Sequence, residues 1–198
     1  IVPASYAAQP DAAKALARLE AAAQVRVEVS PHPLGRAYPG DIGYNVLVCG
    51  GALFGLLPHV APEILRAARA AGLRPVTVRQ GYAGCSTLVC GDLAVTADPS
   101  LRAALHAEGV PVFSLPSGGI ALAGYGCGFI GGASGYAAGA AVFFGDPARY
   151  AAGEALCAEL ARRGIAVYAL RRAPLADFGG IRFVKNRADG CIAHACVL

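Results

Sequence analysis

The 198-residue chain has the length of one domain, and 56% of its residues are apolar, so a substantial core is expected. The formal net charge of +4 is small and the basic residues are scattered, which argues against a nucleic-acid partner. The seven cysteines are an odd number and lack the spacing of a disulfide scaffold, which favours a reducing cytoplasm. We therefore expect a single cytoplasmic domain over residues 1–198.

The first ten residues contain neither a methionine nor the pattern of a secretory signal, and we expect upstream sequence to be missing or trimmed. The segment from Gly109 to Gly145 contains no charged residue, and it is long enough to span a membrane. Dense glycines, with Pro111 and Pro116, disfavour a stable helix there. We therefore expect a buried loop and hairpin, and no membrane partner.

Four helices are predicted from their start and stop signals. The first runs from about Asp11 to Ala22 and lacks a glycine stop. Each of the others ends at a glycine, which readily adopts the left-handed conformation that terminates helices. An Asp-Pro pair opens the last two, because Asp caps free N–H groups and Pro suits the first turn. The three predicted segments are Pro62 to Ala71 before Gly72, Asp98 to Gly109, and Asp146 to Gly164.

A short β-rich segment follows each predicted helix, and an apolar segment with a central turn comes next. In two of these segments the turn follows a cysteine, at Gly50-Gly51 and at Gly91-Asp92, which is typical of a two-residue hairpin. The repeated unit is therefore a strand, a loop, a hairpin and a helix. The predicted strands after the helices are Val25 to Val29, Pro75 to Val78, Val110 to Leu115, and Ile165 to Leu170.

Equivalent points of the units lie at Asn45, Cys85, Gly131 and Gly179, with spacings of 40, 46 and 48 residues. Four units are visible, and the last lacks its helix. Periodicity leaves two arrangements open, namely a flat doubly wound sheet and a ring of units around an axis.

Six strings of the sequence resemble an uncharacterised bacterial family assigned to the pentein fold, the fold of guanidino-group-modifying enzymes. The resemblance implies a pentein-like α/β propeller of repeated strand-hairpin-helix units, with about four visible of the expected five and an N-terminal unit missing. The strings are YPGDIGYN (38–45), QGYAGCSTLV (80–89), LAVTAD (93–98), IALAGYGCGFIGGASG (120–135), FFGD (143–146) and LADFGGI (175–181).

Penteins such as agmatine deiminase, arginine deiminase and dimethylargininase use a Cys nucleophile, a His that shuttles protons, and carboxylates that hold the guanidinium. Their EGGD-type or EGGS-type motif falls on Ile130-Gly131-Gly132-Ala133, where both polar ends are apolar. Their C-terminal GGxIHC-type motif falls on 179–183, where Arg182 and Phe183 replace the His and the Cys. The standard deiminase set of Cys, His and acid is therefore not recognisable in this chain.

Cys85 is the candidate nucleophile, because it lies in a loop-like stretch with polar neighbours; the alternative is a packed, unreactive thiol. Asp41 and Asn45 flank a turn, where they would bind a polar ligand or only cap the turn. We expect a small-molecule site in a concavity bounded by Asp41, Asn45, Gln80, Tyr82 and Cys85. The candidate ligand-binding residues are Asp41, Asn45, Gln80, Tyr82, Ser86, Gly131 and Gly132.

The glycine-rich stretch from Gly118 to Gly135 contains neither GxGxxG nor a GK[ST] ending, so close backbone packing explains it better than a phosphate loop. Cys191, His194 and Cys196 match no common zinc module, and no metal or cofactor is expected. We interpret His32, His59 and His106 as structural or exposed residues.

Three functions remain open. The first is a catalytically silent pentein-fold protein that binds a small guanidino, amidino or other polar metabolite or acts as a scaffold, and it is favoured by the substituted motif positions. The second is an active Cys-dependent hydrolase or transferase that acts on a guanidino compound through Cys85. The third, a nucleotide-binding α/β protein, depends only on the abundance of glycine. The sequence leaves open whether the protein is an enzyme and which oligomeric state it adopts.

Overall fold

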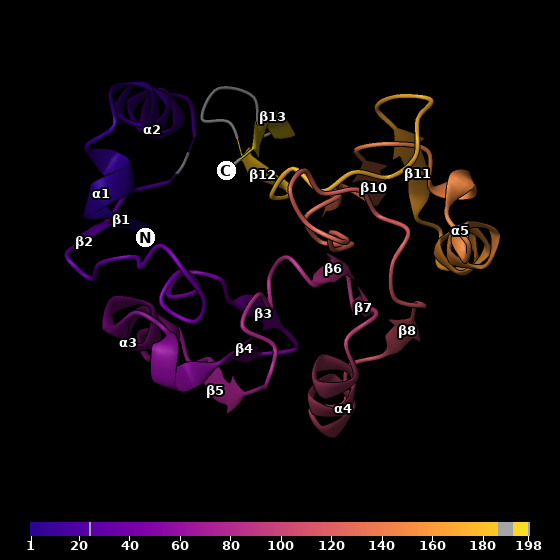
Figure 1. The fold of residues 1–198 in the computed structure, drawn as a ribbon, viewed down its shortest axis with the longest axis horizontal. Helices are drawn as coiled ribbons and strands as arrows, with labels where there is room; N and C mark the ends of the chain where they lie inside the picture. Colours follow the sequence, from indigo (N-terminus) through magenta and orange to yellow (C-terminus); the bar gives the residue numbers. More distant parts are fainter. Residues whose placement is uncertain (24, 186–191, 198) are drawn as a thin grey trace.

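The computed structural model describes residues 1–23, 25–185 and 192–197 of the chain, and side chains are described up to Val184. Its fold is a mixed α/β fold in which the described strands form five small sheets of two or three strands. In Figure 1 the sheets follow one another around a common centre, with the longer helices toward the outside. The expected small sheets are confirmed, and the alternative of one continuous parallel sheet is excluded for the described residues.

Three consecutive units share one topology. In each, two strands form an antiparallel hairpin, a helix follows, and a third strand pairs parallel to the second strand of the hairpin. The first unit consists of β3 (Leu47–Cys49), β4 (Ala52–Gly55), α3 (Pro62–Ala70) and β5 (Arg74–Thr77). The second unit consists of β6 (Thr87–Cys90), β7 (Leu93–Thr96), α4 (Pro99–Ala107) and β8 (Val112–Ser114). The third unit consists of β9 (Ser134–Ala137), β10 (Ala140–Phe143), α5 (Gly153–Arg162) and β11 (Ala166–Ala169). A short 3-10 helix, η1 (Leu57–His59), precedes α3.

Partial units lie at the two ends of the described chain. At the N-terminal end, β1 (Val2–Pro3) pairs parallel with β2 (Val29–Ser30), and α1 (Ala4–Ala7) and α2 (Pro10–Ala22) connect them. At the C-terminal end, β12 (Ile181–Lys185) pairs antiparallel with β13 (Ile192–Val197). The expected count of four units therefore omitted a fifth sheet, which the N-terminal segment forms.

The predicted helix stops are confirmed. Gly72, Gly109 and Gly164 each lie just past a helix, with φ angles of 72°, 74° and 70°. The strand after each of these glycines joins the sheet of its own unit. The hairpin at Gly50 and Gly51 is also present, and both residues have a positive φ.

Two predicted elements differ in the structure. Only Val29 of the expected strand over 25–29 is in β2, and the backbone N–H of Val27 donates to Glu20 Oε1 at 2.7 Å instead of joining a sheet. Asp146 caps only a 3-10 turn, η2 (Pro147–Arg149), and α5 begins later. The extended, buried Tyr150 separates the two, and its hydroxyl donates to the carbonyl of Pro116 in the segment between β8 and β9.

The core consists of two apolar clusters that join neighbouring units. Phe54 and Leu101 belong to the cluster between the first and second units, and Val95 and Phe143 belong to the cluster between the second and third. All four side chains are fully buried. The clusters hold the units against each other, so the loops that precede successive hairpins keep fixed relative positions.

The loops that precede β6, β9 and β12 converge near the centre. A Cβ atom on Gly131 would meet the carbonyl oxygen of Cys85 at 2.7 Å, and one on Gly180 would meet the carbonyl oxygen of Gly131 at 2.7 Å. Glycine therefore allows the backbones of neighbouring units to approach closely here.

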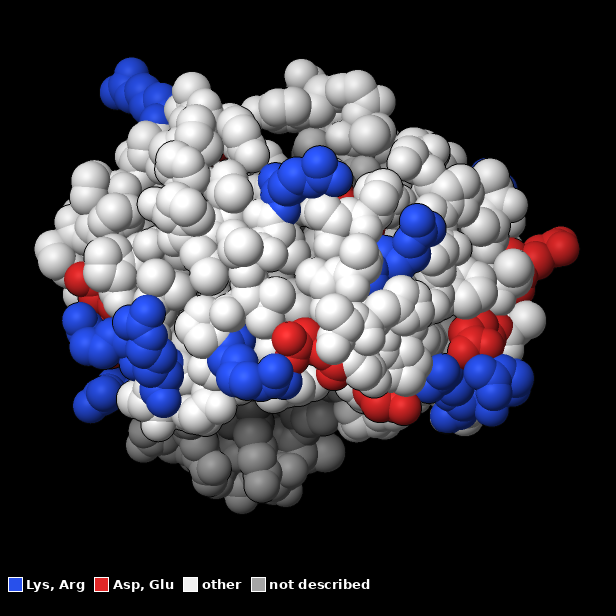
Figure 2. All heavy atoms as spheres, turned by 90° about the horizontal axis from the view of Figure 1, so that it is seen from below, with Lys and Arg blue, Asp and Glu red and all other residues white. Residues whose placement is uncertain are grey.

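Within the described residues, no helix combines the length and hydropathy that a membrane crossing requires. The uncharged segment from Gly109 to Gly145 contains three short strands instead. On the face seen in Figure 2, acidic and basic side chains lie in small groups with broad uncharged areas between them.

Candidate functional site

A cavity of about 410 Å³ lies where the loops that precede β3, β6 and β12 meet β1. We call it the Cys85 cavity. Cys85, Asn45 and Asp41 all line it, so the structure brings together three of the residues that the sequence singled out. Its remaining wall is formed by Ile1, Val2, Pro3, Tyr6, Leu34, Tyr44, Val46, Gly84, Gly179 and Arg182.

Asn45 positions the thiol of Cys85. Its Oδ1 accepts the backbone N–H groups of Gly84 at 2.9 Å and of Cys85 at 3.2 Å. Its Nδ2 donates to Cys85 Sγ at 3.0 Å. One amide thus connects the loops of two units and fixes the thiol at the wall of the cavity.

The Cys85 thiol has a pKa above its ordinary value. Burial is the main cause, and the negative charge of Asp177 adds to it, whereas the Asn45 hydrogen bond and the positive charge of Arg182 lower the pKa. None of the described residues that line the cavity is a histidine. The thiol is therefore protonated at neutral pH, and no imidazole of the described side chains lines the cavity with it.

Asp41 carries an unsatisfied carboxylate oxygen. Its Oδ2 accepts a hydrogen bond of 2.6 Å from the hydroxyl of Tyr82. That bond is the main cause of the rise in the pKa of Tyr82 to about 12. The other oxygen, Oδ1, is buried and has no hydrogen-bond partner in the described part of the chain. Buried carboxylate oxygens are normally paired, so a donor from outside the chain would be stabilised at this position.

Asp177 and Arg182 also belong to this region. Asp177, only 8% exposed, accepts the N–H groups of Phe129 and Gly179, each at 2.9 Å, and so connects the loops that precede β9 and β12. Sequence reasoning did not select Asp177, although it lies in the LADFGGI string before two glycines. Arg182 was expected as a substituted motif position that would repel a cationic guanidinium if it pointed into the site, and it lines the cavity.

The two glycines predicted to bind a ligand lie elsewhere. Gly131 lines a separate cavity of about 360 Å³ between the first strands of the hairpins, which we call the inner-strand cavity. Arg182 lines both cavities. Gly132 packs directly on the carboxylate of Asp177, where a Cβ atom would overlap it. Both glycines therefore act in close packing, and neither lines the Cys85 cavity.

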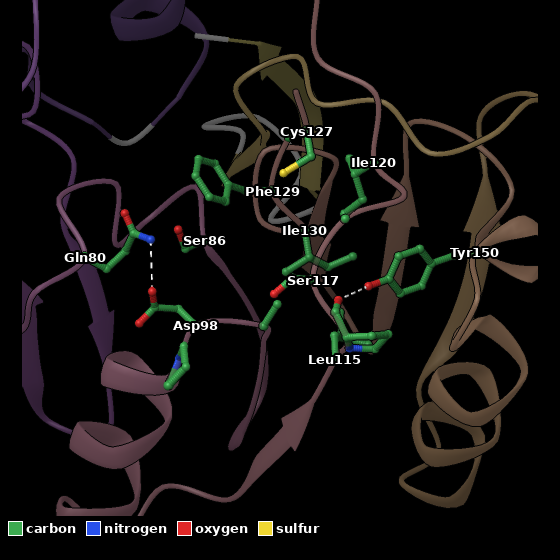
Figure 3. A pocket seen from close by; sticks show the side chains of 15 residues that line it. Gln80, Ser86, Asp98, Leu115, Ser117, Ile120, Cys127, Phe129, Ile130 and Tyr150 are labelled. Atoms are coloured by element: carbon green, nitrogen blue, oxygen red, sulfur yellow. Dashed lines mark hydrogen bonds between the residues drawn. The ribbon is translucent and has the colours of Figure 1, made fainter. Parts of the chain in front are cut away.

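Gln80 and Ser86 line a third pocket, of about 180 Å³, between the second and third units (Figure 3). We call it the Ser86 pocket. Gln80 Nε2 donates to Asp98 Oδ2 at 3.1 Å, and Gln80 Oε1 accepts the N–H of Tyr82 at 3.0 Å. The single concavity expected from the sequence is thus divided, because side chains of the 80–86 loop point to opposite sides of it.

The tail motif lies outside the described side chains, since Cys191 is not described and only the backbone is described at His194 and Cys196. Among the described residues, no group of three or more His, Cys, Asp or Glu side chains is placed to hold a metal ion. His32, interpreted from the sequence as structural or exposed, lies beside Tyr44, with ring centroids 6.4 Å apart.

A protein-family model matches residues 5–182. This chain belongs to that family, which is described as a family of unknown function (DUF6873). No curated protein and no solved structure matches the chain. The family covers every residue of the Cys85 cavity except the first three, and it covers the whole Ser86 pocket.

Proposed function

We propose that this protein has a pentein-like architecture and binds a small cationic metabolite, of guanidino or amidino type, in the Cys85 cavity. The observation that carries the proposal is the buried Oδ1 of Asp41, which has no partner among the described residues. A guanidinium group supplies planar N–H donors and a positive charge, and both match a carboxylate.

The arrangement of the sheets supports the pentein-like part of the proposal. The described chain holds five small sheets, and three of its units repeat one topology. The loops that precede the hairpins converge near the centre, where equivalent positions of repeated units would meet around an axis. The resemblance of the sequence strings to a pentein-fold family agrees with this arrangement.

The charges of the cavity favour one orientation of the ligand. Arg182 lines the same cavity as Asp41, so a cationic group is stabilised beside Asp41 and repelled beside Arg182. The volume of about 410 Å³ lies within the range of about 300–1,000 Å³ that is usual for small-molecule sites. We therefore place the guanidinium or amidinium group at Asp41.

The test compares methylguanidine, a cation, with methylurea, a neutral molecule of nearly the same shape. Calorimetric titration is expected to show tighter binding of methylguanidine. Asp41→Asn is expected to weaken that binding about tenfold or more, since hydrogen bonds to charged groups contribute about 1.5–3 kcal/mol. Asp92→Asn is the matched control, because Asp92 lies on an exposed hairpin turn and pairs with Arg163. Equal affinity for the two probes, or equal losses in the two variants, would contradict the proposal.

A Cys85-dependent hydrolase or transferase is the second candidate. The contact between Asn45 Nδ2 and Cys85 Sγ favours it, since it places the thiol in the same cavity as Asp41. The raised thiol pKa favours binding over catalysis. The rate of alkylation of Cys85 by iodoacetamide separates the two. Binding alone predicts slow alkylation at pH 7 that accelerates beyond pH 9, whereas a catalytic thiol predicts fast alkylation at pH 7 and turnover of methylguanidine.

A further inference from the structure

Ser86 has a buried hydroxyl with no hydrogen-bond partner among the described residues. The residue is 3% exposed and lines the Ser86 pocket. Its backbone is fully engaged, because its N–H donates to the carbonyl of Tyr82 and its carbonyl accepts from Thr96 Oγ1. Buried hydroxyls are nearly always paired, so this free oxygen indicates a position that a ligand group would occupy.

The rest of the wall is mainly apolar and held in place. Leu115, Ile120, Phe129 and Ile130 surround the space, as Figure 3 shows. The hydroxyl of Tyr150 donates to the carbonyl of Pro116, which fixes the opposite side. The volume of about 180 Å³ is close to that of an engineered apolar cavity, about 150 Å³, that binds benzene.

The charge of the wall narrows the choice of ligand. Asp98 is the only charged residue that lines the pocket in the described part of the chain. Its carboxylate already accepts from Gln80 Nε2, Ser100 Oγ and the N–H of Leu101 at the start of α4. The Asp98 carboxylate would repel an anionic ligand. Its hydrogen bonds are already made by these three donors, so it does not require a cationic ligand as a partner.

From these observations we propose that the Ser86 pocket is a second ligand site. It takes a small neutral molecule with an apolar body and one hydroxyl or amide group, which pairs with Ser86 Oγ. The site is independent of the Cys85 cavity and of the function proposed for that cavity, since the described residues that line the two do not overlap.

Cys127 provides a reporter for the site. It is exposed, and it lines the Ser86 pocket beside Gly128. In Figure 3 its sulfur points toward the space between Phe129 and Ile130. A molecule bound in the pocket would therefore shield this thiol from solvent.

The first experiment uses phenol and toluene, which have nearly the same shape but differ in the hydroxyl group. Both affinities are measured by protein-observed NMR titration for the wild type and for Ser86→Ala. We expect saturable phenol binding to the wild type and, in Ser86→Ala, a loss of the preference for phenol over toluene by about 2–12-fold, the effect of one hydrogen bond. Unsaturable phenol binding, or an unchanged preference in the variant, would overturn the proposal.

The second experiment needs no variant. Saturating phenol is expected to slow the alkylation of Cys127 by N-ethylmaleimide at least threefold, measured by peptide mass mapping. Cys157 on α5 does not line the pocket, so its rate is the internal control and is expected to stay constant. An unprotected Cys127 would count against the site. Asp41 does not line the Ser86 pocket and Ser86 does not line the Cys85 cavity, so failure of one proposal does not entail failure of the other.

Discussion

Cys85 and Ser86 are adjacent in the sequence, yet their side chains line different pockets. The sulfur of Cys85 is held by Asn45, and its cavity contains the charged residues Asp41 and Arg182. The hydroxyl of Ser86 is buried without a partner in the described chain, and its pocket is mainly apolar. The first site is suited to selection by charge and the second to selection by size and by one hydrogen bond. One loop between two units can therefore serve two kinds of recognition.

The largest effect is expected from a substitution at Gly131, because it would disrupt the Cys85 cavity and the Ser86 pocket together. Gly131→Ala would direct a Cβ atom against the carbonyl oxygens of Thr87, Gly84 and Cys85, which are rigid backbone atoms. We expect a loss of about 3 kcal/mol in the free energy of unfolding, since overpacking displaces backbone that cannot relax. Urea denaturation measures it. Gly126→Ala is the control, because nothing lies near its Cβ position, and its effect should stay within about 0.5 kcal/mol. Equal effects in the two variants would show that the close approach at Gly131 is not rigid.

A smaller effect is expected at Asn45. Asn45→Ala removes the acceptor of the Gly84 and Cys85 N–H groups, and it removes the donor to Cys85 Sγ. The free energy of unfolding should fall by about 2 kcal/mol, the cost of leaving buried donors unpaired. The same urea measurement applies. A change below about 0.5 kcal/mol would mean that the two loops are held together without this amide.

A substitution at Ser86 is expected to raise the free energy of unfolding, whereas Gly131→Ala and Asn45→Ala are expected to lower it. Ser86→Ala removes a buried hydroxyl that has no partner among the described residues, so the ligand-free protein should gain up to about 1 kcal/mol in the free energy of unfolding. A clear loss in the absence of ligand would show that the hydroxyl is paired, for example by an ordered water molecule.

The smallest expected effect depends on pH and concerns the Cys85 cavity alone. The hydrogen bond to Asp41 raises the pKa of Tyr82 to about 12 in the folded protein, above the value of about 10 in an unfolded chain. The stability that this bond contributes is complete below pH 10 and is lost as the pH rises from 10 to 12. Urea midpoints between pH 9 and 12 measure the loss. Tyr82→Phe should remove this part of the pH dependence, and an unchanged profile in the variant would contradict the assignment.

Local signals predicted the units well because they act over a few residues. Gly72, Gly109 and Gly164 ended helices as expected, because glycine adopts a positive φ without steric cost. The prediction at Asp146 was wrong in extent, because the contact between Tyr150 and Pro116 interrupts the helix. That contact is made with the segment between β8 and β9, 34 residues away along the chain, and local start signals do not include it.

The regular spacing left open whether the units form a flat sheet or a ring, and only the tertiary structure brought the loops that precede β6, β9 and β12 together near the centre. The sequence by itself determined the repeated units, since their helix stops and hairpin turns are local signals. It also selected Asp41, Asn45 and Cys85, which the structure brings into one cavity. Only the tertiary structure decided that Gln80 and Ser86 face another pocket, and that Asp177 links the loops of two units. The direction of a side chain in an irregular loop depends on which neighbouring unit accepts its hydrogen bonds. The partners lie 40 residues apart for Asn45 and Cys85, 48 for Asp177 and Phe129, and 18 for Gln80 and Asp98, beyond the range over which local sequence patterns act.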